Sequence, residues 1–188
     1  MDAFLVSTLV IAVGEIGDKT QLLALLLAAR FRRPVPIILG IVCATVTNHA
    51  IAGAMGQWLH AAVSPQALRW GIGVSFIAIA LWALVPDKME DEPALHGRYG
   101  VFLVTLIAFF LAEIGDKTQI ATIVLAARYN ALVPVVAGTT LGMLLADVPA
   151  VLLGHRASRT IPFKAVRLAA AGLFAVLGLL VLFGAGSL

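Results

Sequence analysis

Charged residues are scarce in this sequence. Asp, Glu, Lys and Arg make up 12% of the 188 residues, whereas hydrophobic residues make up 61%. A soluble domain has about a quarter of its residues charged. A folded chain of this size cannot hide so much apolar surface in its own core, so the excess is expected to face lipid. The composition therefore predicts an all-α integral membrane protein.

Cysteine is almost absent as well. The single Cys43 excludes an intramolecular disulfide framework and a metal cluster held by several thiolates. The net charge of +3 does not require a nucleic-acid partner, because basic loops at a membrane surface account for it. The first residues, MDAFLVSTLV, are acidic where a signal peptide is basic, so no signal peptide is expected.

Long apolar stretches dominate the chain instead. A membrane-crossing helix needs about 20 mostly apolar residues, and six stretches qualify: 3–29, 35–59, 68–86, 99–127, 133–154 and 163–184. Soluble strands are excluded because the runs are too long, and their glycines and alanines suit close helix contact in lipid. We therefore expect six transmembrane helices.

Basic residues gather in the loops on one side of these six spans. The other side carries only Arg69 and Arg128, whereas this side carries Arg30, Arg32, Arg33, Lys88, Arg98, Arg156, Arg159, Lys164 and Arg167. Positive residues mark the cytoplasmic face, so both termini are expected outside the cytoplasm. The acidic segment 87–92 is then cytoplasmic. We interpret it as a solvated linker, with a regulatory cation site as the alternative.

The sequence matches itself when it is shifted by 98 positions. EIGDKTQ at Glu15–Gln21 falls on the same seven letters at Glu113–Gln119, and no gap follows. The expected units are a first three-helix repeat at 1–86, a linker at 87–98 and a second repeat at 99–188. Because three is an odd number, the second repeat must be inverted in the membrane, as in many secondary transporters. A duplicated scaffold without transport is the alternative.

Each copy of the repeated motif places charges near the middle of a span. A charged side chain at that depth costs at least about 2.5–3.5 kcal/mol, which favours a functional reason for it. Glu and Asp three positions apart would share one helix face. Gly17 and Gly115 allow close helix approach or a local break that frees backbone carbonyls.

The two motifs together predict an oxygen-lined cation site. Its carboxylates are Glu15, Asp18, Glu113 and Asp116, with further oxygens from Thr20, Gln21, Thr118 and Gln119. Such ligands suit Mn²⁺, Ca²⁺ and Mg²⁺. Four acids and two lysines leave a charge of −2, which one divalent cation neutralises. We expect Lys19 and Lys117 to pair with Glu15 and Glu113 when the site is empty; purely structural ion pairs are the alternative.

Three more polar residues lie deep in the spans. The 98-residue shift places His49 on Asp147, and Asn48 precedes His49. An ionisable residue within a span has a functional role by default, so Asp147 is a candidate fifth acidic ligand or proton carrier. Asn48 is a further candidate ligand. His49 is a candidate for proton coupling, with a hydrogen-bonded packing residue as the equal alternative.

The twin motifs resemble those of a known family. E-I-G-D-K-T occurs at Glu15–Thr20 and Glu113–Thr118, one copy in each half, and resembles the motif pair of cation transporters that include bacterial manganese exporters and Golgi-type calcium/manganese–proton antiporters. The resemblance covers essentially the whole chain. It implies six membrane helices, Mn²⁺ or Ca²⁺ as substrate, exchange for protons, and cation binding by the Glu and Asp of both motifs.

The expected function is secondary transport rather than catalysis. The chain lacks the N-terminal extension and long central loop of eukaryotic family members, which implies a bacterial inner membrane and favours Mn²⁺ export, with Ca²⁺/H⁺ exchange as the alternative. An intramembrane metalloenzyme is disfavoured because the histidines at 49, 60, 96 and 155 are scattered; a membrane scaffold is a further alternative. The expected partners are a divalent metal ion, protons and lipid. No resident cofactor is expected, and homo-oligomerisation stays open.

Overall fold

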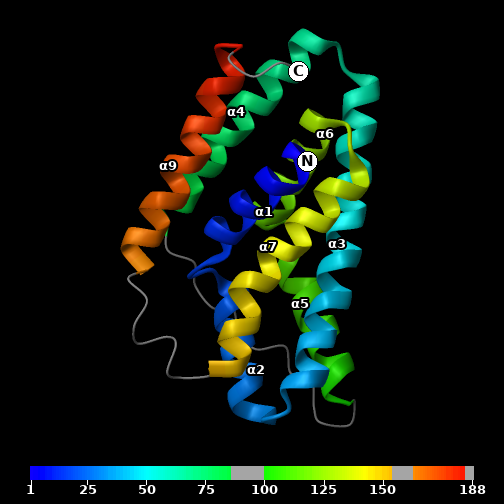
Figure 1. Cartoon of the computed structure of the whole chain (residues 1–188), viewed down its shortest axis with the longest axis vertical. Helices are drawn as coiled ribbons and strands as arrows, with labels where there is room; N and C mark the ends of the chain where they lie inside the picture. Colours follow the sequence, from blue (N-terminus) through cyan, green and yellow to red (C-terminus); the bar gives the residue numbers. More distant parts are fainter. Residues whose placement is uncertain (86–99, 154–162, 185–188) are drawn as a thin grey trace.

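The described part of the protein is entirely helical. The computed structural model describes residues 1–85, 100–153 and 163–184. The expected linker 87–98, with its acidic segment, lies outside these residues. The helices are α1 (Asp2–Glu15), α2 (Lys19–Phe31), α3 (Pro34–Ala62), α4 (Pro65–Ala83), α5 (Val101–Glu113), α6 (Lys117–Tyr129), α7 (Leu132–Leu153) and α9 (Phe163–Leu182) (Figure 1). The all-α prediction is confirmed for this part of the chain.

Four helices are long and apolar enough to cross a membrane, namely α3, α4, α7 and α9. The other two expected spans, 3–29 and 99–127, are each divided into two shorter helices, α1–α2 and α5–α6. The backbone turns at Gly17 (φ 84°) and Gly115 (φ 76°). Glycine has no β-carbon and adopts this left-handed conformation readily. A single helix through either motif is therefore a wrong expectation, whereas the local break is found.

The helices of the two halves run in opposite senses in Figure 1. α3 rises through the core from the lower end, and α7 descends beside it; α4 descends and α9 rises as a second pair. α1 packs on α7, and its counterpart α5 packs on α3. α1 begins and α9 ends toward the upper end of the molecule, whereas the α2–α3 turn lies at the lower end.

Reciprocal contacts relate the two halves. The Thr45 hydroxyl donates to Met143 Sδ over 3.3 Å, and the rings of Phe76 and Phe174 lie 6.2 Å apart. Both pairs are separated by 98 positions, so each residue contacts its own counterpart. In a two-fold arrangement this occurs only close to the axis that relates the copies. In the described residues, equivalent positions of the two halves therefore meet where α3 contacts α7 and where α4 contacts α9.

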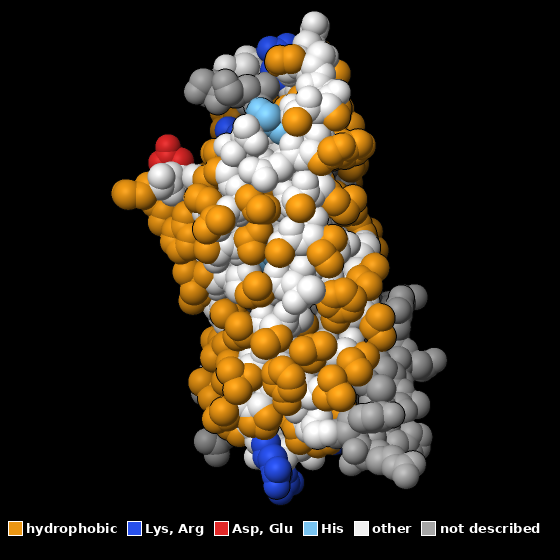
Figure 2. Space-filling model, turned by 90° about the vertical axis from the view of Figure 1, so that its right-hand side faces the viewer, with side chains coloured by type: hydrophobic (Ala, Val, Ile, Leu, Met, Phe, Trp, Pro, Cys, Tyr) orange, Lys and Arg blue, Asp and Glu red, His pale blue; other side chains and the backbone are white. Residues whose placement is uncertain are grey.

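The outer surface is strongly apolar. Large hydrophobic side chains on several helices are exposed, among them Leu5, Val35, Met55, Leu81, Leu145 and Leu179. Figure 2 shows hydrophobic side chains over most of one face, with Lys and Arg side chains gathered at its two ends. This distribution suits a molecule surrounded by lipid along its length and by water at its ends.

Candidate functional site

The charged residues of each motif lie at a break between two helices. α1 ends at Glu15, and Asp18 is the N-cap of α2, where its Oδ1 accepts a hydrogen bond from the Lys19 backbone N–H over 2.6 Å. In the second half α5 ends at Glu113, and Asp116 is the N-cap of α6. The glutamate and aspartate of one motif therefore do not share a helix face. That expectation is wrong because the glycine between them ends the first helix.

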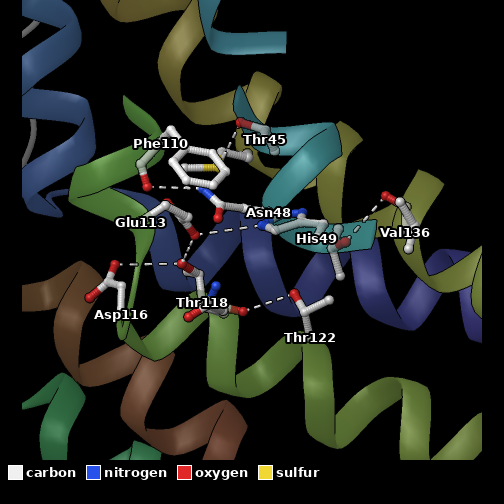
Figure 3. A network of polar contacts seen from close by, with 12 residues as sticks. Thr45, Asn48, His49, Phe110, Glu113, Asp116, Thr118, Thr122 and Val136 are labelled. Carbon is white, nitrogen blue, oxygen red and sulfur yellow. Dashed lines mark hydrogen bonds and ion pairs between the residues drawn. The ribbon is translucent and has the colours of Figure 1, made fainter. Parts of the chain in front are cut away.

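The breaks provide groups that an unbroken helix would not. The last turn of a helix has carbonyl groups without partners and carries partial negative charge, which favours a cation. One such carbonyl, that of Phe110 in α5, accepts a hydrogen bond from Asn48 Nδ2 over 3.1 Å (Figure 3). Asn48 on α3 therefore ties the first half of the chain to the broken helix of the second.

Two glutamine side chains form hydrogen bonds with the backbone at the helix breaks. The Gly17 N–H donates to Gln21 Oε1 over 2.9 Å, and the Gly115 N–H donates to Gln119 Oε1 over 2.8 Å. Gln21 Nε2 also donates to the Ala146 carbonyl of α7 over 3.1 Å. Each amide oxygen accepts one hydrogen bond and has a second lone pair, and metal ligation by Gln21 and Gln119 stays a prediction.

Five acidic side chains share one buried region. Glu15, Asp18, Glu113, Asp116 and Asp147 are each at most 1% exposed. The electrostatic environment of Glu15 includes the other four carboxyl groups, and that of Asp147 on α7 includes Glu113 and Asp18. The structure therefore brings together the four motif acids and Asp147, which come from both halves of the chain.

Glu113 is held by neighbours from two helices (Figure 3). The Thr118 hydroxyl donates to Glu113 Oε1 over 2.5 Å and lies 3.5 Å from Asp116 Oδ2. His49 Nε2, from α3, lies 3.5 Å from the same Glu113 oxygen. His49 is thus in direct contact with a motif acid, which fits both interpretations of this residue, proton coupling and packing.

Glu15 lacks the hydrogen bond that its counterpart Glu113 accepts. Among the described residues, neither carboxylate oxygen of Glu15 or Asp147 has a hydrogen-bond partner, and the hydroxyl of Thr20, the counterpart of Thr118, also lacks one. Asn48 Oδ1 and Glu113 Oε2 are without partners in the same part of the chain. A buried carboxylate without a partner is very unfavourable. These oxygens therefore indicate a place for a cation or for protons.

Each motif lysine forms an ion pair with the aspartate of the other half. Lys117 Nζ lies 2.8 Å from Asp18 Oδ2, and Lys19 Nζ lies 3.5 Å from Asp116 Oδ1. The expected pairing of Lys19 with Glu15 is wrong, and Lys117 is likewise drawn to the other half, because the break places each lysine beside the opposite N-cap. Within the described residues, no three His, Cys, Asp or Glu side chains are yet arranged as a metal site.

The family model described as "Divalent cation/proton antiporter GDT1" matches residues 3–91 and 101–187. The chain belongs to the GDT1 family. It is therefore a member of a family of membrane transporters for divalent cations, as the twin motifs predicted, and the family description names a transport activity rather than an enzymatic one.

Relatives of the GDT1 family occur in bacteria and plants. A Vibrio cholerae protein named "Putative manganese exporter" is 49% identical over 184 residues, which cover 97% of this chain and 92% of that protein. A GDT1-like protein of Synechocystis is 32% identical over 194 residues, with 93% of each chain covered. GDT1-like protein 5 of Arabidopsis thaliana is 28% identical over 208 residues, with 89% of each covered. No solved structure matches the chain.

Proposed function

We propose that this protein exports Mn²⁺ across a bacterial inner membrane in exchange for protons. The proposal rests on five buried carboxyl groups that lie close together, four of them at the two helix breaks and the fifth, Asp147, on α7. In the described residues, the carboxyl oxygens of Glu15 and Asp147 have no hydrogen-bond partners. Carboxylate, amide and carbonyl oxygens suit hard divalent cations such as Mn²⁺ and Ca²⁺. The name of the Vibrio cholerae relative favours Mn²⁺; Ca²⁺/H⁺ exchange is the second candidate.

In this proposal the chain crosses the membrane six times as two inverted three-helix repeats. α1–α2 and α5–α6 each form one broken crossing, and α3, α4, α7 and α9 form the other four. Support comes from the opposite senses of equivalent helices and from the reciprocal contacts near the two-fold axis. Arg32 and Arg33 follow α2 at the lower end of Figure 1, which favours a cytoplasmic lower end and external termini.

Metal and protons compete for the same carboxylates in the proposed cycle. Burial and crowding of like charges favour the protonated form of a carboxyl group. At the cytoplasmic side Glu15, Asp18, Glu113 and Asp116 release protons and bind the metal, with Asp147 and Asn48 as additional ligands. The halves then rock, and protons from outside displace the metal. His49, in contact with Glu113, is placed to accept a proton in this exchange.

Unequal packing of α4 and α9 supports alternation between two states. On α1, Val13 packs against the small cluster formed by Ala83 of α4 with Ala170 and Ala171 of α9. Its counterpart on α5, Leu111, is 55% exposed. α4 also packs on α6, whereas the equivalent helices α9 and α2 make at most slight contact in the described residues. We infer that the α4–α9 pair packs on α1 and α6 here and on their counterparts α5 and α2 in the opposite state.

A cysteine pair can capture that opposite state. Under the 98-residue shift, Val13 corresponds to Leu111 and Ala170 corresponds to Ile72. Packing of Val13 on the cluster that contains Ala170 then becomes packing of Leu111 beside Ile72. In a Cys43→Ser background, we expect Leu111→Cys with Ile72→Cys to form a disulfide during Mn²⁺ transport and to stop transport until it is reduced. Val13→Cys with Ala170→Cys is the matched pair for the present state. A Leu111–Ile72 pair that never cross-links under turnover would contradict this movement.

Proton flux in proteoliposomes tests the proposed function. Purified protein is reconstituted with a pH-sensitive dye inside the vesicles, and Mn²⁺, Ca²⁺ or Mg²⁺ is added on one side. We expect metal-dependent proton movement in the opposite direction, with Mn²⁺ more effective than Ca²⁺ in competition. Proton flux driven better by Ca²⁺ favours the second candidate, and no metal-dependent flux contradicts both.

A further inference from the structure

The ion pairs between Lys117 and Asp18 and between Lys19 and Asp116 are reciprocal. Each joins the first residue of α2 or α6 to the N-cap of the other of these two helices, and the 98-residue shift converts one pair into the other. The ammonium groups therefore lie where the two halves meet. They contact two of the four carboxylates that the proposed metal would need.

The two lysines differ in how firmly they are held. The side chain of Lys117 is 4% exposed and lies 2.8 Å from Asp18, whereas that of Lys19 is 27% exposed and lies 3.5 Å from Asp116. A buried ammonium group is very unfavourable unless a carboxylate compensates it. The ammonium group of Lys117 therefore lies buried among the acidic side chains. Lys19 is more exposed to solvent and lies farther from its aspartate.

The lysines compensate the acidic region only in part. Five buried carboxyl groups face two ammonium groups, and Glu15 and Asp147 have no hydrogen-bond partner in the described ranges. While Asp18 holds Lys117, its carboxylate is oriented toward an ammonium group, and the described acids are not arranged as a metal site. Binding a divalent cation through Asp18 requires this pair to separate.

We propose that Lys117 is a tethered cation that occupies the empty transport site and is displaced from Asp18 when the divalent cation binds. The inference rests on the proposed function of the site. Lys117 keeps its proton throughout: the metal takes the place of the ammonium group beside Asp18, and the ammonium group returns when the metal leaves. The metal therefore always binds in competition with a charge supplied by the chain itself.

This competition sets the affinity of the site. Without an internal cation, so many carboxylates would hold a divalent ion tightly and release it slowly. An ammonium group that returns to Asp18 favours release. It also leaves the empty site less negatively charged, which eases the return of the empty transporter across the apolar membrane interior. Lys19, being looser, contributes less to both effects.

Equilibrium binding of Mn²⁺ to the purified full-length chain tests the proposal. Electron paramagnetic resonance measures free Mn²⁺ in detergent solution without any transport step. We expect Lys117→Gln to lower the Kd about tenfold, because it removes a positive charge from the site. Lys117→Arg should raise the Kd about threefold, since a guanidinium group grips a carboxylate through two hydrogen bonds. Lys19→Gln, the matched control, should lower it less than Lys117→Gln does.

The outcomes separate this inference from the proposed function. If the wild type binds Mn²⁺ but Lys117→Gln leaves the Kd unchanged or raises it, the tethered-cation role is overturned and the transport site stands. If the wild type binds neither Mn²⁺ nor Ca²⁺, both fail. If Lys117→Gln does not fold, the Kd of Lys117→Arg tests the proposal instead: a Kd that does not rise above that of the wild type overturns it. Loss of folded protein in both variants would assign Lys117 to the fold and overturn the proposal.

Discussion

Replacing Glu113 by Gln is expected to reduce metal-dependent proton flux about 30- to 5,000-fold, which corresponds to the roughly 2–5 kcal/mol lost when one member of a buried charge interaction is removed. Glutamine has nearly the same shape and still accepts the hydrogen bond that the Thr118 hydroxyl donates to Glu113. The change therefore removes negative charge from the site with little effect on packing. Flux is measured in proteoliposomes at equal reconstitution levels.

Glu15→Gln is expected to cause a loss of similar size, because both motif glutamates belong to one site in this account. Asp2→Asn provides the matched control: Asp2 is an exposed acid in the first turn of α1, and its replacement should leave the flux close to that of the wild type. A Glu113→Gln protein that transports at the wild-type rate would rule out the assignment of the transport site to these carboxyl groups.

Gly138→Ala is expected to destabilise the protein by about 1–3 kcal/mol, the usual effect of overpacking a close contact. A β-carbon on Gly138 of α7 would lie 2.5 Å from the Phe4 carbonyl oxygen of α1. The obstacle is backbone, so α1 must shift away from α7. For a chain of this size the loss corresponds to a fall in melting temperature of about 2–4 °C per kcal/mol. Transport should fall too, because α7 carries Asp147 and α1 carries Glu15.

Gly172→Ala is the matched control for that substitution. Gly172 lies in α9, and a β-carbon there would meet nothing within 4 Å. Alanine is favoured over glycine within a helix by about 1 kcal/mol, so this variant should be as stable as the wild type or slightly more stable. Thermal unfolding in detergent, followed by size-exclusion chromatography, measures both. Equal melting temperatures for the two variants would contradict the close α1–α7 contact.

The sequence predicts the composition of the site better than its geometry. The 98-residue repeat and the scarcity of charge identify the motif acids, and the same shift identifies Asp147 through His49. These predictions rest on the cost of a buried charge in an apolar chain, which calls for a specific reason. Contact between counterparts such as Phe76 and Phe174 is the kind of contact that two equal halves related by a two-fold axis would make.

The helix breaks were foreseen only as one of two roles for the motif glycines, although a signal for them exists. Asp18 followed three residues later by Gln21 has the spacing of a capping box, which marks the beginning of a helix. The structure departs from that motif by one residue, because Gln21 accepts its hydrogen bond from the N–H of Gly17, which precedes the N-cap Asp18. Hydropathy alone predicts one continuous helix, because the apolar run continues on both sides of the motif.

The pairing of lysines across the halves could not be predicted from spacing. Within an unbroken helix, Lys19 would lie one turn from Glu15, so the local pair was the natural expectation. Once Gly17 ends α1, Lys19 begins a new helix and lies beside Asp116 of the other half. Such a contact depends on how the halves dock, which the sequence of either half does not contain.

Anomalous scattering from bound Mn²⁺ at the manganese absorption edge tests the central claim most directly, that two motifs build one site. The account predicts a single manganese peak between the two helix breaks, with carboxylate oxygens from both Glu15 and Glu113 around it. Two separate peaks, or one peak whose protein ligands come from a single half of the chain, would contradict it.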